Sequence, residues 1–147
     1  MTRRLLLSTF LLVVIIGIIT TDVANGQTRV EVVLEYGGND LVGRSLYYLV
    51  KEELRKSTAF DLRDSPQDAF IRIRLHTSDS STPPAGESSA VAVIVTLLPS
   101  DSYLHDQVIF VGRNRVREVA TLIAAGIDQY LEELFRDARK SRQKAPK

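Results

Sequence analysis

The residues of this chain whose types could carry out chemistry gather around one of its two histidines. His105 lies within a few positions of Ser100, Asp101, Ser102 and Asp106, which are the residue types of a hydrolytic triad. Triads are recognised by their geometry, and the loop predicted here lacks the rigid strand-to-helix turn that presents a nucleophile. A small hydrolase around His105 is therefore the most distant of three functional hypotheses.

Thiol chemistry and metal binding have less support in the sequence than the hydrolase around His105. The chain contains no cysteine, which excludes thiol catalysis and thiolate metal sites. The other histidine, His76, is far from His105, and neither belongs to a His-Glu-x-x-His pattern or to another metal-ligand spacing. We therefore predict no catalytic residue, no metal site and no cofactor, and interpret both histidines as ordinary surface residues.

Residues 37–40, Gly-Gly-Asn-Asp, lie between a predicted strand and a predicted helix, where phosphate-binding loops occur. They lack the spacing and the Lys-Ser/Thr ending of such loops, and Asp40 would place a negative charge where phosphate binds. A turn followed by a helix cap, at Asp40 or Asn39, explains them better. Gly43 and Gly126 fall inside predicted helices, where glycine costs stability, and this raises the question of close packing at both positions.

Hydrophobic periodicity predicts the elements that would position these residues. Alternation of polar and apolar residues predicts a strand over Val30 to Tyr36, and further strands are predicted over 60–62, 70–76, 90–98 and 107–111. Residues 77–89 and 99–106 are predicted to connect strands. Two helices follow from apolar stripes at helical spacing, the second of them capped by Asn114. The stripes consist of Val42, Leu46, Leu49, Val50 and Leu54 in the first helix and of Val116, Val119, Ala120, Ile123, Ile127, Leu131 and Leu134 in the second.

This order of elements predicts an α+β fold. Helices with one apolar side need a sheet face to cover, and the strands after residue 60 have no helical crossovers between them. The economical arrangement is a two-layer sandwich with both helices on one face of a mixed, mostly antiparallel sheet of about five strands. The nearly continuous apolar run over 90–98 predicts an interior strand.

The first 26 residues are typical of an export signal. Arg3 and Arg4 precede an apolar stretch from Leu5 to Ile19, and Ala24 and Gly26 provide the small residues that signal peptidase requires for a cut before Gln27. We predict removal of residues 1–26 and a periplasmic or secreted location. Retention of the segment as a membrane anchor is the alternative, since the apolar stretch approaches the length that spans a bilayer.

Charge divides the remaining chain into two parts. Residues 136–147 hold six basic residues and one acidic residue, so residues 27–135 are acidic. We predict a single domain over 27–135 and a basic, disordered tail over 136–147. No aromatic residue lies among the basic ones, so nucleic acid is not an expected partner, whereas an anionic membrane surface is an alternative one. The contacts to such a surface would come from Arg136, Arg139, Lys140, Arg142 and Lys144.

The order of these elements is similar to that of a known domain. An export signal, a strand over Val30 to Tyr36 that leads through residues 37–40 into a helix, the Phe60-Asp61-Leu62 strand, a long hairpin and a closing helix resemble the amino-terminal α/β domain of TolB-like periplasmic proteins. They also resemble related domains of envelope-assembly lipoproteins. The resemblance covers nearly all of residues 29–135 and implies protein docking in the cell envelope without catalysis. The chain departs from these families because it lacks both the propeller of TolB and the lipobox cysteine of the lipoproteins.

The sheet face turned away from the helices is the candidate interaction surface. Alternation predicts that it is half charged and half apolar, and the apolar additions from the last two strands, whose parity is less certain, are Ile94, Leu98, Ile109 and Val111. One interpretation is cross-strand ion pairing of Glu31 and Glu35 with Arg72 and Arg74. The other is an exposed apolar patch that binds a protein or a second copy of the chain. The predicted surface consists of Glu31, Val33, Glu35, Arg72, Arg74, His76, Ile94 and Ile109.

The sequence therefore favours an exported, non-enzymatic domain that binds another envelope protein, or itself, through this sheet face or an edge strand. The alternative is a binder of an anionic small ligand or polymer through Arg72, Arg74 and the basic tail.

Overall fold

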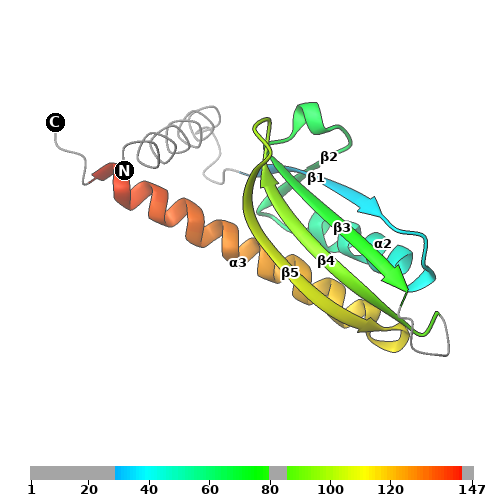
Figure 1. The fold of residues 1–147 in the computed structure, drawn as a ribbon. Helices are drawn as coiled ribbons and strands as arrows, with labels where there is room; N and C mark the ends of the chain where they lie inside the picture. Colours follow the sequence, from blue (N-terminus) through cyan, green and yellow to red (C-terminus); the bar gives the residue numbers. More distant parts are fainter. Residues whose placement is uncertain (1–28, 80–85, 144–147) are drawn as a thin grey trace, which may run out of the picture. The chain divides into compact units, whose positions relative to one another are not determined.

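The computed structural model describes residues 29–79 and 86–143, and it places two helices and a five-stranded sheet in two layers (Figure 1). Both helices lie on the same side of the sheet, so the predicted two-layer α+β sandwich is confirmed. The predicted signal segment and Lys144 lie outside the described residues. The elements are β1 (Val30–Gly37), α2 (Leu41–Lys56), β2 (Phe60–Arg63), the 3₁₀ turn η2 (Pro66–Asp68), β3 (Ile71–Asp79), β4 (Ser88–Leu97), β5 (Ser102–Gly112), the 3₁₀ turn η3 (Arg113–Arg115) and α3 (Val116–Gln143).

The strands follow the order β2-β1-β3-β4-β5 across the sheet. β1 is parallel to both of its neighbours, whereas β4 is antiparallel to β3 and to β5, and these antiparallel ladders are the longer ones. β4 is an interior strand, as its continuous apolar sequence predicted. The two edges of the sheet are β2, with four residues, and β5, with eleven.

The hydrophobic core lies between the helices and the sheet. Residues 29–126 form one compact unit, and the residues of α3 from Ile127 onward belong to a second one. Inward residues of neighbouring strands are paired in register, for example Leu34 with Ile73 and Ile73 with Val95, and the last two are completely buried. The stripe of α2 is buried at Val42, Leu46, Val50 and Leu54, and that of α3 at Val116, Val119, Ala120, Ile123, Ile127 and Leu131.

Several predicted boundaries were wrong. β3 and β4 extend into the predicted connection over 77–89, because Ser78 pairs with Ala90 and the buried Ser89 hydroxyl donates a hydrogen bond to the Ser78 carbonyl (3.1 Å). β5 begins at Ser102, so the predicted loop over 99–106 is mostly strand. Asn114 lies within the 3₁₀ turn η3, and α3 begins two residues later than this predicted cap.

The basic segment also differs from the prediction where the structure describes it. α3 continues to Gln143, so residues 136–143 are helical, whereas a disordered tail was expected. Arginine, lysine, alanine and glutamine are good helix formers, and the first residue that would break the helix, Pro146, comes later. No helix among the described residues is long and apolar enough to cross a membrane.

The turn over residues 37–40 caps α2, as predicted. The Asp40 carboxylate accepts hydrogen bonds from the backbone N–H of Gly43 (2.5 Å) and from the Thr77 hydroxyl, and Asp40 itself is buried. The Tyr36 hydroxyl lies 3.1 Å from the Thr77 hydroxyl and links β1 to the same network. Burial acts to raise the pKa of Asp40, but the hydrogen bonds from Thr77, Gly43 and Ser89 act against it, and the net result is a pKa below the usual value.

The two helical glycines predict opposite effects of substitution. A Cβ atom on Gly43 would lie 2.1 Å from the Thr77 hydroxyl oxygen, whereas a Cβ atom on Gly126 would meet nothing within 4 Å. We expect Gly43→Ala to lower the free energy of unfolding by about 1 to 3 kcal/mol because the network must move. Gly126→Ala should raise it by about 0.5 to 1 kcal/mol through helix propensity alone. Urea unfolding of the two variants checks this, and a stabilising Gly43→Ala would contradict the close packing.

Candidate functional site

The sheet face turned away from α2 and α3 is called the open face here. Figure 1 views the sheet from this side, with both helices behind the strands. Cross-strand partners share a face, so the register of the ladders assigns its members. They are Asp61 and Arg63 of β2; Glu31, Val33, Glu35 and Gly37 of β1; Arg72, Arg74, His76 and Ser78 of β3; Ala90, Ala92, Ile94 and Thr96 of β4; and Tyr103, Asp106, Val108 and Phe110 of β5.

Most of the predicted surface residues lie on the open face. Glu31, Glu35, Arg72, Arg74, His76 and Ile94 share it through the register of β1, β3 and β4. Val33 is on the same side but is buried in a small cluster with Ala69 and Leu98, so it offers no surface.

The prediction for β5 was wrong. Ile109 pairs with the completely buried Val91, and Val111 pairs with the buried Ser89, so both side chains point to the helix side. The open face instead carries Val108 and Phe110.

Over β1, β2 and β3 the open face is charged, and its charges are paired with one another. Glu35 forms ion pairs with Arg72 (3.2 Å) and Arg74 (3.0 Å), as predicted, and Arg72 also pairs with Asp101. Glu31 pairs with Arg63 (2.5 Å) and not with the predicted β3 arginines, because Arg63 lies on the opposite neighbour β2. The hydrogen bond from Arg63 to Glu31 raises the pKa of the arginine.

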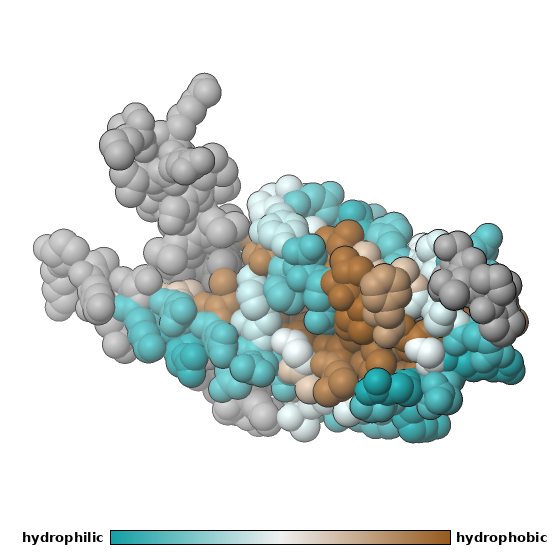
Figure 2. All heavy atoms as spheres, turned by 60° about the horizontal axis from the view of Figure 1, so that its bottom comes forward, coloured by the Kyte–Doolittle hydropathy of each residue, from teal (hydrophilic) through white to brown (hydrophobic). Residues whose placement is uncertain are grey.

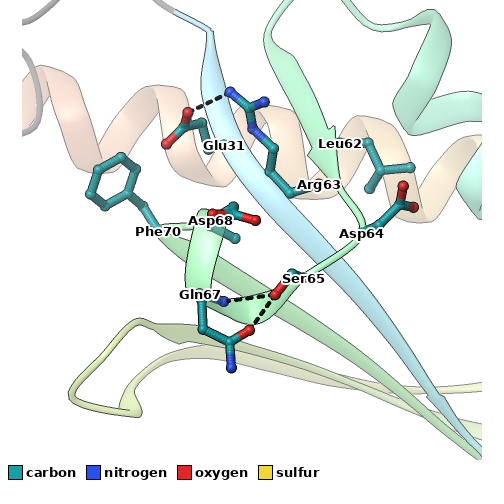
Figure 3. Close-up of a pocket in the computed structure, with 9 residues that line it drawn as sticks. Glu31, Leu62, Arg63, Asp64, Ser65, Gln67, Asp68 and Phe70 are labelled. Carbon is teal, nitrogen blue, oxygen red and sulfur yellow. Dashed lines mark hydrogen bonds and ion pairs between the residues drawn. The ribbon is translucent and has the colours of Figure 1, made fainter.

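A depression of about 570 Å³ borders this charged area at the end of β2. Figure 3 shows Arg63 bonded to Glu31 and Ser65 bonded to Gln67 in its lining. Asp64 and Asp68 also line it, so carboxylates outnumber the single guanidinium. The depression therefore does not have the charge of a phosphate-binding or other anion-binding site.

Over β4 and β5 most side chains of the open face are apolar, and Asp106, between Tyr103 and Val108 on β5, is the charged exception among the described residues. Phe110 is 76% exposed, Val108 67% and Tyr103 62%, values that are high for side chains of this size. Figure 2 turns the lower side of Figure 1, where β5 and α3 lie, toward the reader and shows hydrophobic side chains gathered in one area of the surface. Contiguous exposed apolar area on a small protein is typical of a binding surface. We call Tyr103, Val108 and Phe110, with the β4 residues Ala90, Ala92 and Ile94 beside them, the apolar patch.

A shallow depression of about 270 Å³ lies beside Val108 in this patch. Small residues line it, including Gly37, Ala90 and Ala92, together with His76. The His76 ring covers Gly37 so closely that a Cβ atom there would lie 2.7 Å from the imidazole Nδ1. The depression can receive an apolar side chain of a partner next to Val108.

The residues of the hypothetical triad are not arranged as one. His105 lies in β5 and pairs with the buried Val95, so it points to the helix side, whereas Asp106 is on the open face. Asp101 is paired with Arg72, and the Ser100 and Ser102 hydroxyls bond to each other at 2.8 Å. Alternation along the strand thus separates side chains that are neighbours in the sequence.

Sequence reasoning missed Val108, Phe110 and Tyr103. Tyr103 was assigned to a loop, whereas the structure places it in β5 before a β-bulge: Val95 pairs with His105 but Thr96 pairs with Tyr103, which leaves Leu104 as the extra residue. The bulge brings odd-numbered Tyr103 and even-numbered Val108 and Phe110 to the same face. Residues 108–111 are all apolar, so the sequence held no signal for their direction.

Several solved structures resemble this fold, among them the following two. TolB from Acinetobacter baumannii superposes with a TM-score of 0.54 at 14% identity, over 75% of this chain and 30% of TolB. A protein of Xanthomonas campestris from the family designated DUF330 superposes with a TM-score of 0.58 at 5% identity, over 78% of this chain and 93% of its own. No family model and no curated protein sequence matches the chain. The chain thus spans less than a third of TolB, and the resemblance to TolB that the element order suggested is confirmed for the fold.

Proposed function

We propose that this chain is a non-catalytic protein of the cell envelope that binds another protein through the apolar patch on its open face. The observation that carries the proposal is the exposure of Phe110 and Val108 side by side with the depression over Ala90 and Ala92. Large apolar side chains next to a shallow apolar hollow are what protein-binding surfaces use as anchors.

The location in the envelope is supported by the signal-like first 26 residues and by the fold. The basic pair Arg3 and Arg4, the apolar stretch and the cleavage pattern are typical of exported chains. The fold is shared with TolB, and the TolB-like resemblance implies docking without catalysis.

Binding of an anion is the weaker hypothesis, because the arginines that it needs are already paired. Arg72 contacts Glu35 and Asp101, and Arg74 contacts Glu35, so an anionic ligand would have to replace these carboxylates. In the helical part of the basic segment, Arg136 and Lys140 are exposed, and Lys140 lies 3.8 Å from Asp137.

Site-specific photo-crosslinking tests the proposal. A photoreactive phenylalanine analogue is placed at position 110 or, as a control, at position 122, because Leu122 is equally apolar and 59% exposed but lies on α3. In the envelope fraction of the source organism, we expect one defined protein adduct from position 110 and none from position 122. Unlabelled wild-type chain should compete for this adduct, whereas the Phe110→Asp chain should compete at least about tenfold more weakly.

The salt dependence of binding distinguishes protein docking through the apolar patch from anion binding. Apolar docking should persist at about 1 M salt, where the screening length is about 3 Å, whereas attraction to anions should be lost. Equal labelling from positions 110 and 122, or an adduct that Phe110→Asp competes for as well as wild type does, would contradict the proposed surface. Phe110→Asp should fold normally, since substitutions at exposed positions change stability by about 0.5 kcal/mol or less.

A further inference from the structure

The two edge strands of the sheet differ in how well their sequences prevent pairing with a strand of another chain. Edge strands expose backbone groups that can pair with another chain, and proteins block them by shortness, charge or proline. β2 is short and carries Asp61 and Arg63. β5 has eleven residues, and its segment Gln107 to Gly112 contains neither a charged residue nor proline. Among the described residues, β5 has a strand partner on one side only.

The second half of β5 is also a regular strand. The bulge at Leu104 lies before it, and from Asp106 to Gly112 every residue pairs with β4 without interruption. The strand is rich in the β-branched and aromatic residues that favour sheets, Val108, Ile109, Phe110 and Val111. A regular edge strand without charge from Gln107 to Gly112 can accept another strand.

Only a few registers allow β5 to pair with β5 of a second copy. For the two sheets to be continuous, each residue must face one from the same side of the sheet, so the two-fold axis passes through a residue. An axis at Val108 would place Phe110 opposite Asp106, and an axis at Gln107 would place Val108 opposite Asp106. Both registers put a carboxylate against an exposed apolar side chain.

An axis at Ile109 avoids this conflict. Val108 then lies opposite the second copy's Phe110 on the open face, twice by symmetry, and such aromatic and β-branched pairs stabilise antiparallel strands. Asp106 lies opposite Gly112, which has no side chain to meet it, and no two like charges face each other between positions 106 and 112. An axis at Phe110 would leave a shorter ladder, because β5 ends at Gly112.

We infer that two copies of this chain pair antiparallel through residues 106–112 of β5, with the two-fold axis at Ile109. The inference deepens the proposed function and rests on it in one respect: the paired strands join the two apolar patches into one surface for the partner protein. Val108 and Phe110 of both copies lie next to one another at the centre of this surface, as the same-face rule for cross-strand partners requires.

Disulfide trapping tests the register, because the chain has no cysteine of its own. In the inferred dimer the two copies of residue 109 face each other with Cα atoms about 4.5 to 5.5 Å apart, within reach of a disulfide. Under mild oxidation we expect Ile109→Cys to form a covalent dimer, seen by non-reducing electrophoresis and intact mass. Leu122→Cys, on the exposed side of α3, is the matched control and should remain monomeric. Trapping of Ile109→Cys no faster than the control would overturn the inference.

Sedimentation of the full chain over a concentration series gives a second measurement. Ile109→Lys places two ammonium groups opposite each other and should weaken dimerisation at least about tenfold, while Leu122→Lys should leave it unchanged. Gln107→Lys places a charge on the same edge at a polar position, so a similar weakening there shows that misfolding of Ile109→Lys is not the cause. A wild-type chain that remains monomeric overturns the inference.

The crosslink from position 110 distinguishes this inference from the proposed function. If the wild-type chain is monomeric but the adduct from position 110 still forms, the self-pairing is wrong and the docking function stands. If disulfide trapping succeeds but the only adduct from position 110 has the mass of two copies of this chain, the dimer stands and the docking function is wrong.

Discussion

Ile123→Ala is expected to lower the free energy of unfolding by about 2 to 5 kcal/mol. The Ile123 side chain is completely buried on the side of α3 that carries the apolar stripe. Its truncation removes buried methyl and methylene groups and leaves a cavity that close-packed neighbours fill only in part. Urea unfolding followed by circular dichroism measures the loss.

The neighbouring residue supplies the control. Leu122 has the same number of side-chain carbons but is 59% exposed on the other side of the helix, so Leu122→Ala should change the free energy of unfolding by about 0.5 kcal/mol or less. A loss below about 1 kcal/mol for Ile123→Ala, or equal losses for the two variants, would mean that the stripe is not the packed side of α3.

Asp40→Ala is expected to lower the free energy of unfolding by about 2 to 4 kcal/mol at neutral pH. The variant loses the helix cap on the Gly43 N–H, which is worth about 1 kcal/mol, and it leaves the half-buried Thr77 hydroxyl without this acceptor. The effect exceeds that of an ordinary surface carboxylate because Asp40 is only 7% exposed. Asp64→Ala is the control, since the Asp64 carboxylate is almost fully exposed and lies 3.9 Å from Lys51, and it should have little effect.

The contribution of Asp40 should depend on pH in one direction. Its pKa is lowered in the folded protein, so the stabilisation is complete above the unfolded-state value of about 4 and is lost as the pH falls through the folded value. The stability difference between wild type and Asp40→Ala should therefore shrink below about pH 4. Urea unfolding of both proteins between neutral pH and pH 3 checks this. A difference that stays constant, or that grows in acid, would contradict a hydrogen-bonded and ionised Asp40.

The elements with one buried side could be predicted from the sequence. Alternation in β1 and β3 and the stripes of α2 and α3 placed the core correctly, because apolar residues at period 2 or 3.6 leave only one side to bury. The Asp40 cap could be predicted as well, since it depends on residues close together in the chain.

The candidate site was predicted only in part. Contacts that depend on alternation within a strand could be predicted, whereas contacts that depend on strand order or on distant turns could not. Glu35 could be paired with Arg72 and Arg74 because alternation alone puts these residues on one face. Glu31 could not be matched with Arg63, because its partner depends on which strand lies on the other side of β1. Val33 could not be recognised as buried, because Ala69 and Leu98, which cover it, come from turns far away in the sequence.

The sequence by itself determined that two one-sided helices cover a single sheet, since burying an apolar stripe is a local requirement of each segment. The tertiary structure alone decided which side chains of β5 point outward. Four consecutive apolar residues over 108–111 satisfy either direction, and the choice is made by the pairing of Ile109 with buried Val91 and by the bulge at Leu104. Register is a property of two strands together, so no single segment could have specified that Val108 and Phe110 form the exposed surface.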